Sequence, residues 1–103
     1  MNSLIKDRFE DLNKLCEKFR VRRLELFGSA AVKDRPDSQI NDLDFLVEFQ
    51  PLNPGEYADT YFGLLESLEN LFGMHVDLVM IRAVKNPYFL KAIDKTRQEL
   101  YAA

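Results

Sequence analysis

The sequence predicts an α/β (α+β) domain in which helices flank a small mixed β-sheet. Apolar residues recur at helical spacing in two long segments, residues 3–19 and 56–72. Three shorter segments alternate apolar and polar residues as strands do, at residues 21–27, 43–49 and 75–81. Helices and strands that follow one another in this way are typical of a sheet backed by helices. The chain of 103 residues is expected to form one domain, 1–103.

The first half of the chain begins with the helix at residues 3–19. Ser3 is a candidate N-cap for it. The strand at residues 21–27 follows, and Gly28 ends it. A short helix is expected to begin at Ser29 and to run through the next three residues.

The strand at residues 43–49 shows the clearest alternation and follows a loop that contains Pro36. One face of this strand carries Leu43, Phe45, Val47 and Phe49, and the other carries Asp42, Asp44, Leu46 and Glu48. The apolar face therefore predicts the side that packs on the core.

The second half holds the helix at residues 56–72, with Gly73 as its expected C-cap. The third strand, residues 75–81, follows. Asn86 and Pro87 then fit an N-cap and a first helical position. The helix that they begin is expected to reach the C-terminus, and its apolar positions are Phe89, Leu90, Ile93 and Leu100.

Composition excludes several classes of protein. The formal net charge of −3 is unlike that of a nucleic-acid binder, so no direct nucleic-acid partner is expected. Cys16 is the single cysteine, which forbids an internal disulfide and suits a cytoplasmic location. The N-terminal stretch is charged from Lys6 onward and lacks the apolar segment of a signal peptide. No apolar run approaches the roughly 20 residues that span a bilayer, so no membrane partner is expected.

Three aspartates stand where strands are expected. Asp42 and Asp44 point to one side of the second strand, and Asp77 lies in the third strand among residues expected to be buried. Buried charges are costly unless they are paired or bind a metal. If the two strands are neighbours, the carboxylates come within about 5 Å of one another. Such an all-oxygen set suits Mg²⁺, with Mn²⁺ as second choice.

The Gly-Ser pair after the first strand suggests what such ions would hold. Gly28 permits a tight turn and a close approach to a ligand, and Ser29 would offer backbone N–H groups to phosphate. Two Mg²⁺ ions about 4 Å apart are a known arrangement for phosphoryl displacement. Alone, each motif is common in ordinary turns and strand ends. Their order and spacing together favour a site for a nucleoside triphosphate.

These residues resemble the nucleotidyltransferase superfamily that includes DNA polymerase β. Its pattern is a Gly-Ser turn, a D-x-D strand and a carboxylate on a later strand, which stand here as Gly28-Ser29, Asp42-Leu43-Asp44 and Asp77. The chain is most similar to the minimal nucleotidyltransferase (MNT) type. The resemblance runs from about Leu24 to the C-terminus and implies a polymerase β-like nucleotidyltransferase fold, with "NPYFLKAIDKTRQELYAA" as the family's terminal helix.

The chain departs from the family in one stretch. The family commonly reads G-S-x-A-R-G, often with arginine at x, and this chain reads "GSAAVKD". Ala31 is kept, whereas Ala30 stands at x and Val32 and Lys33 replace the arginine and glycine. These changes bear on triphosphate affinity. Lys33 or Arg35 would supply the missing positive charge.

The resemblance implies a Mg²⁺-dependent nucleotidyltransferase that uses ATP. MNT proteins are often antitoxins of HEPN-type ribonuclease toxins, and are similar to enzymes that move AMP from ATP to a tyrosine of the toxin. Asp42 and Asp44 would hold both metals. Asp77 would hold the metal that activates the acceptor hydroxyl and would serve as its base. Gly28 and Ser29 would cradle the triphosphate.

Two alternatives stay open. In one, the altered Gly-Ser region has ended catalysis, and the chain neutralises a partner by contact alone; its acidic character would suit a basic partner. In the other, the chain is a small-molecule transferase of the aminoglycoside type, which usually needs a further helical domain. The sequence also leaves open the nucleotide, the acceptor, dimerisation and the role of His75, which shares a strand face with Asp77. On the last helix, Lys85, Lys91, Lys95 and Arg97 are expected to form a solvated face.

Overall fold

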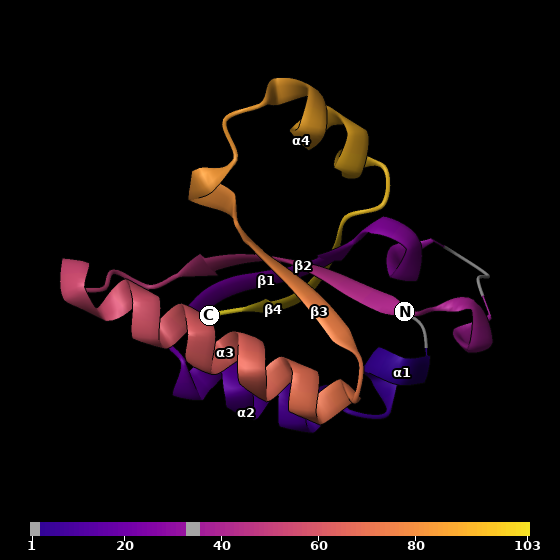
Figure 1. Ribbon diagram of the computed structural model, residues 1–103, viewed down its shortest axis with the longest axis horizontal. Coiled ribbons are helices and arrows are strands. Elements are labelled where there is room, and N and C mark those ends of the chain that lie inside the picture. Colours follow the sequence, from indigo (N-terminus) through magenta and orange to yellow (C-terminus); the bar gives the residue numbers. More distant parts are fainter. Residues whose placement is uncertain (1–2, 33–35) are drawn as a thin grey trace.

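A four-stranded mixed sheet forms the centre of the protein (Figure 1). The computed structural model describes residues 3–32 and 36–103, so Lys33 and Arg35 lie outside the described residues. The strands are β1 (Val21–Phe27), β2 (Asp42–Phe49), β3 (His75–Met80) and β4 (Gln98–Ala102), and their order in the sheet is β3-β2-β1-β4. The pair β2 and β3 is parallel, whereas β1 is antiparallel to both β2 and β4. The predicted mixed sheet is confirmed.

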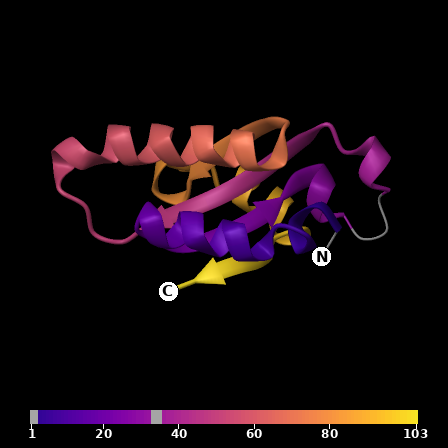
Figure 2. The same cartoon turned by 90° about the horizontal axis from the view of Figure 1, so that it is seen from below.

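Two long helices cover one face of the sheet, and one short helix stands over the other. The α-helices are α1 (Ser3–Lys6), α2 (Phe9–Lys18), α3 (Tyr57–Phe72) and α4 (Pro87–Asp94). Short 3₁₀ turns are η1 (Gly28–Ala31), η2 (Asp37–Gln39), η3 (Pro54–Glu56) and η4 (Ile81–Ala83). Figure 2, a view from below, shows α2 and α3 side by side in front of the sheet, and Figure 1 shows α4 on the opposite side. None of the helices in the described ranges combines the length and apolar character that crossing a bilayer requires.

The main core lies between the sheet and the helices α2 and α3. The four apolar residues that alternate along β2 are all buried there: Leu43, Phe45, Val47 and Phe49. Leu12 and Cys16 from α2 and Leu64 and Leu68 from α3 meet them. The opposite face of β2 therefore carries Asp42 and Asp44, as the alternation predicts.

The predicted helix at residues 3–19 is interrupted. It is divided into α1 and α2 by a turn at Asp7 and Arg8, where the Arg8 N–H donates to the carbonyl of Ile5 and not to that of Leu4. Apolar spacing does not reveal this break, because Ile5 and Leu12 both remain fully buried on the same side.

The predicted C-terminal helix is wrong beyond residue 94. The helix α4 ends at Asp94, and residues 98–102 form β4, which pairs with the free edge of β1. Leu100 follows Ile93 at a helical interval, yet it is buried in the main core as a strand residue. Tertiary pairing with β1 overrides the local helical pattern here.

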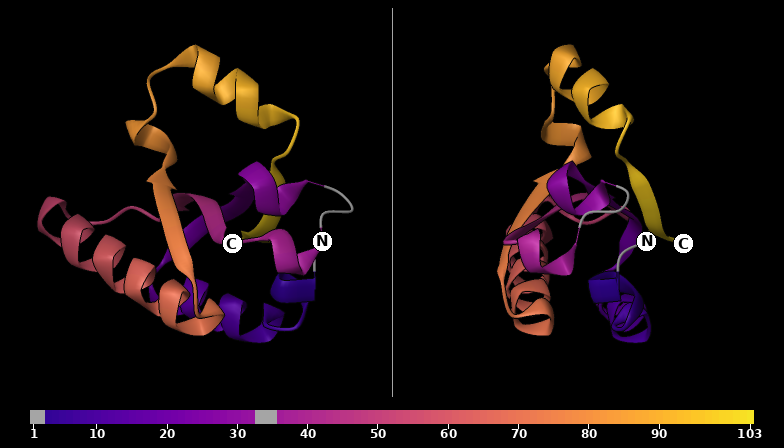
Figure 3. Two further views of the ribbon diagram at one scale, coloured as in Figure 1. Left: turned by 45° about the vertical axis from the view of Figure 1, so that its right-hand side comes forward. Right: turned by 90° about the vertical axis from the view of Figure 1, so that its right-hand side faces the viewer.

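The segment from Ile81 to Arg97, which we call the strap, links the two edges of the sheet. It leaves β3 at one edge, carries α4 and returns to β4 at the other edge (Figure 3). A small apolar cluster holds α4 to the sheet; it consists of Phe27, Leu46, Ile93, Val79, Phe89 and Leu90. Asn86 caps α4 by accepting a hydrogen bond from the Tyr88 N–H, as predicted.

A buried ion pair fastens the end of the strap. The Glu25 side chain is 4% exposed and accepts two hydrogen bonds from Arg97, with N···O distances of 2.6 and 3.0 Å. Arg23 lies 2.9 Å from the same carboxylate, and Arg97 also contacts Asp94. Arg97 was expected on a solvated face, which is wrong because Arg97 directly precedes β4 and turns its side chain to the buried Glu25. Lys85, Lys91 and Lys95 are exposed as expected.

We expect Arg97→Ala to lower the free energy of unfolding by about 3 kcal/mol, because it leaves the buried Glu25 carboxylate without its main partner. Arg22→Ala is the matched control. The ion pair between Arg22 and Glu48 is long, 3.6 Å, and the Arg22 side chain is 61% exposed. Arg22→Ala should therefore lower the free energy of unfolding by less than about 1 kcal/mol. Urea unfolding at pH 7 measures both. Equal losses would contradict a special role for the buried pair.

The same ion pair predicts a pH dependence. The hydrogen bond from Arg97 holds the pKa of Glu25 below its ordinary value of 4.5. The pair therefore contributes its full stability above pH 4.5 and loses it as the pH falls through the lowered pKa. The variant Glu25→Gln should lack this loss of stability at acid pH. The free energy of unfolding of both proteins, measured from pH 7 down to pH 3, tests this.

Candidate active site

The parallel pairing of β2 and β3 brings the predicted acids together. In this register Asp44 lies opposite Asp77, and Asp42 lies opposite His75. All four side chains are on the face of the sheet that is turned away from α2 and α3. The expectation that the two strands are neighbours, with Asp77 beside the Asp42 and Asp44 pair, is therefore confirmed in geometry.

Asp44 is the most perturbed group of this cluster. Its side chain is half-buried, and this burial raises the pKa of Asp44 from 3.8 to about 6. The hydrogen-bonded carboxyl of Asp77 and the negative charges of Asp77 and Asp42 act in the same direction, while His75 opposes them. A bound cation would stabilise the charged form of a carboxyl that is crowded in this way.

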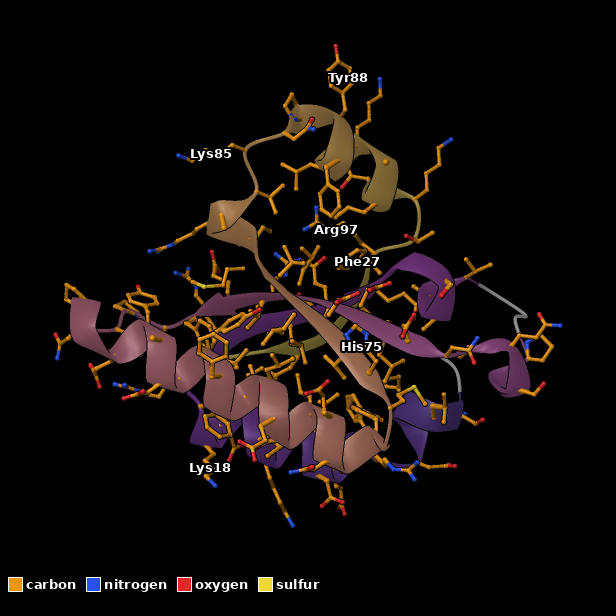
Figure 4. The ribbon with its side chains drawn as sticks, in the orientation of Figure 1. Lys18, Phe27, His75, Lys85, Tyr88 and Arg97 are labelled. Carbon is orange, nitrogen blue, oxygen red and sulfur yellow. The ribbon has the colours of Figure 1, made fainter. Side chains whose placement is uncertain are left out.

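His75 lies between the two exposed acids. Its Nδ1 is 3.2 Å from Oδ1 of Asp42, and its Nε2 is 3.7 Å from Oδ1 of Asp77. Figure 4 shows the ring on the sheet beside β3. The alternation along β3 predicted the shared face with Asp77. The contact with Asp42 depends on the register between the strands, which the sequence does not reveal.

Asp77 is not buried, and that expectation was wrong. Val76 and Leu78 on either side of it face the core, but the Asp77 side chain is 57% exposed. The reason is that β3 is an edge strand, so Asp77 points to the solvent face of the sheet. Its position fits a group that meets incoming molecules.

Gly28 brings the backbone of the Gly-Ser turn against Asp44. Its φ of +74° is a conformation that favours glycine, and a Cβ at this position would overlap the Oδ2 atom of Asp44. The close approach follows from the sheet, because Phe27 pairs with Asp44 in the ladder between β1 and β2. Only glycine therefore allows the turn and the carboxylate to coexist.

The turn itself is shorter than predicted. A helix was expected from Ser29, but residues Gly28–Ala31 form a single 3₁₀ turn that ends at the extended Val32. Ser29 is exposed at its surface. The side-chain amide of Gln98 donates to the carbonyl of Ala31 at 3.1 Å, which ties the turn to the beginning of β4.

The donor groups fit a Mg²⁺ ion that binds together with its substrate. Within residues 3–32 and 36–103, no group of three or more His, Cys, Asp or Glu side chains is gathered into a ready-made metal site. Asp44 and Asp77 are adjacent, whereas Asp42 is turned toward His75. Mg²⁺ is usually held by one or two carboxylates plus substrate phosphates, so the Asp44 and Asp77 pair suffices as the protein's part.

A cleft of about 480 Å³ opens over these acids, a size that suits a small ligand. Its lining comes from β1, β2, β3, α3 and α4: Phe27, Asp44, Tyr61, Leu65, Glu69, His75, Val76, Asp77, Leu78, Val79 and Phe89. An apolar pocket of about 450 Å³ adjoins it and shares Tyr61, Leu78 and Val79. The cleft thus joins an acidic floor to apolar walls.

The cleft walls include three aromatic residues that the sequence did not indicate as site residues: Phe27, Tyr61 and Phe89. Phe27 and Phe89 meet edge to face with their ring centroids 5.9 Å apart. The Tyr61 hydroxyl donates to the Leu78 carbonyl, and burial raises the pKa of Tyr61. Helical spacing marks Tyr61 and Phe89 as packing residues, and nothing local distinguishes a core wall from a cleft wall.

Comparison with known proteins adds a family. The family model described as "Nucleotidyltransferase domain" matches residues 10–100 of this chain. A relative from Methanocaldococcus jannaschii, named "putative protein adenylyltransferase", is 37% identical over 94 residues, which cover 90% of this chain and 91% of the relative.

Solved structures show the same fold. One described as "putative minimal nucleotidyltransferase" aligns with a TM-score of 0.69 and 28% identity, over 91% of this chain and 90% of that one. Another is a tri-AMPylated HEPN toxin of Shewanella oneidensis in complex with MNT antitoxin. It aligns with a TM-score of 0.64 over 95% of this chain and 72% of that one, at 18% identity, which speaks for the fold alone.

Proposed function

Because this chain belongs to the nucleotidyltransferase domain family, we propose that it transfers AMP from ATP to a hydroxyl of a partner protein. The partner would be a HEPN-type toxin, and the modified group a tyrosine. This chain would then act as its antitoxin. ATP as the donor suits a cytoplasmic enzyme. The observation that carries the proposal is the adjacent Asp44 and Asp77 pair beside the Gly28 turn.

Each site residue has a task in this reaction. Asp44 and Asp77, with Asp42 after its side chain leaves His75, would hold Mg²⁺. The positive charge of the ion would stabilise the negative charge that develops on the phosphoryl group during transfer. The Gly28 turn lets the triphosphate approach the backbone, with Ser29 at its surface.

Asp77 is the base that best fits the acceptor. It is exposed at the sheet edge, where an incoming hydroxyl can reach it. The hydroxyl oxygen forms a bond to the α-phosphorus while the bond to the bridging oxygen breaks, and pyrophosphate leaves. The hydroxyl proton passes to the Asp77 carboxylate and then to solvent.

Two comparisons support the choice of acceptor. The M. jannaschii relative carries the name of a protein adenylyltransferase, and the chain covers nine tenths of it. A neighbour in fold was solved with an AMPylated HEPN toxin. In addition, the cleft opens at the sheet edge, which leaves it accessible to a large acceptor.

Intact-mass spectrometry tests the proposal. A candidate HEPN-type partner protein is incubated with this protein, ATP and Mg²⁺. We expect an AMP-sized adduct with the wild type and with Glu48→Gln, since Glu48 shares the face of Asp44 but lies outside the cleft lining. Asp44→Asn should give none. An adduct formed equally by Asp44→Asn would refute the assignment.

The alternative of a binding antitoxin rests on one feature of the site. Asp42 is engaged by His75, so the three acids do not form a ready-made metal centre. In that case the partner would be neutralised without an adduct, and the double variant Asp42→Ala with Asp44→Ala would neutralise it as well as the wild type does.

A further inference from the structure

The outer surface of the strap carries a row of cations around an exposed aromatic ring. Tyr88, Lys91 and Lys95 follow one another at intervals of three and four residues along α4 and its C-cap, which aligns them on one side, and Lys85 stands directly before the N-cap Asn86. All four are exposed, and Tyr88 is 81% exposed. Figure 4 shows Tyr88 directed away from the sheet and Lys85 directed sideways from the strap, to the left. We call this row the cationic face.

The cationic face has no partner among the described residues. The inward side of α4 packs on the sheet through Phe89, Leu90 and Ile93, so the outward side is not needed for packing. Asp94, the one acid of the strap, is held by Arg97. None of the ion pairs formed within residues 3–32 and 36–103 includes Lys85, Lys91 or Lys95. Exposed aromatic rings of this kind are enriched in protein interfaces.

The cationic face lies on the same helix, α4, that forms one wall of the candidate active site. Phe89 directly follows Tyr88 and lines the cleft together with Asp44 and Asp77. A protein that brings a hydroxyl to Asp77 must therefore pass close to α4. The net charge of −3 conceals this local charge, because the strap has five cations and one acid.

We infer that the cationic face docks an acidic segment of the acceptor protein, next to the hydroxyl that receives AMP. This inference rests on the proposed function, since it names the chemistry that recognises the acceptor. Carboxylates on the acceptor that are spaced by about one helical turn would match Lys91 and Lys95, and Tyr88 would cover apolar surface beside them.

An RNA partner fits these observations less well. Tight binding to nucleic acid commonly neutralises about 6–10 phosphates, and the cationic face offers three lysines. Asp42 and Asp77, both 57% exposed on the same side of the sheet, would repel a polyphosphate chain. A short acidic protein segment can contact the strap and avoid both aspartates.

Binding of two defined peptides tests the inference. They have equal length and one central tyrosine, flanked by glutamates in one and by lysines in the other. Fluorescence anisotropy measures their affinity for the wild type, at low salt and at about 0.5 M salt, where charge attraction is screened. The strap variant carries Lys85→Gln, Lys91→Gln and Lys95→Gln. The control carries Lys6→Gln, Lys14→Gln and Lys18→Gln, an equal change of charge on exposed residues of α1 and α2, on the far side of the sheet (Figure 4).

We expect the wild type and the control to bind the glutamate peptide about tenfold more tightly at low salt, and the strap variant to show no preference. The inference would be overturned if the wild type bound both peptides equally or bound neither. It would also be overturned if the strap variant kept the preference for the glutamate peptide. So would an RNA oligomer that binds more tightly than the glutamate peptide and loses its affinity in the strap variant.

Transfer of AMP to the same peptides separates the two proposals. A binding preference without any transfer to tyrosine would leave the docking surface standing and count against the proposed function alone. Transfer to both peptides at equal rates, with equal affinity, would leave the proposed function standing and refute the docking surface.

Discussion

Asp44→Asn is expected to lose AMP transfer by a factor of the order of 10³ while keeping its fold. The change preserves the shape of the side chain but removes the carboxylate that lies nearest to both the Gly28 turn and Asp77. Mg²⁺ would lose one of its fixed ligands, and the transferred phosphoryl group would lose the charge stabilisation that the ion supplies. Transfer at the wild-type rate would contradict the role of Asp44.

The same variant has a readout that needs no acceptor. Without metal, the wild type should lose stability as the pH rises from 3.8 through about 6, because the folded pKa of Asp44 lies above its ordinary value. Asp44→Asn lacks this loss and should be at least as stable as the wild type at pH 7.

Added Mg²⁺ should reverse the ranking. An ion at 100 times its dissociation constant stabilises the folded wild type by about 2.7 kcal/mol. Thermal unfolding with and without Mg²⁺ measures this gain, and Asp44→Asn should show little of it. An equal gain in both proteins would place the metal ion elsewhere.

Gly28→Ala is expected to damage both the fold and the site. The positive φ of +74° costs about 1–2 kcal/mol for a residue with a Cβ. The new methyl group would also overlap the Asp44 carboxylate and displace it from Asp77. We therefore expect a loss of stability above 2 kcal/mol and a loss of transfer that persists at temperatures where the variant is folded.

Two other glycines serve as controls that separate the backbone cost at Gly28 from the overlap with Asp44. Gly73 also has a positive φ, +65°, but a Cβ there meets nothing within 4 Å, so Gly73→Ala carries the backbone cost alone. Gly55 has neither feature, and Gly55→Ala should be neutral or stabilise the protein by up to about 1 kcal/mol. Urea unfolding and transfer assays of the three variants test this order. A Gly28→Ala variant that behaves like Gly73→Ala would show that the approach to Asp44 is unimportant.

The sequence predicted the features that depend on neighbouring residues. The strand β2 and its two faces follow from strict alternation, and the caps Gly73 and Asn86 follow from local backbone chemistry. The pair Asp42 and Asp44 on one face is a consequence of the strand period. The Gly-Ser turn, the D-x-D strand and Asp77 were enough to indicate the nucleotidyltransferase family, which the family model confirms.

The tertiary structure decided what depends on distant residues. The strand β4 exists because the free edge of β1 accepts residues 98–102, and this pairing sets Arg97 against the buried Glu25, 72 residues away. The register of β2 and β3 sets Asp44 against Asp77 and His75 against Asp42, and it leaves Asp77 exposed at the edge. The alternation of one strand fixes which residues share its face. Which strand lies beside it, and in what register, is decided by packing across the whole sheet.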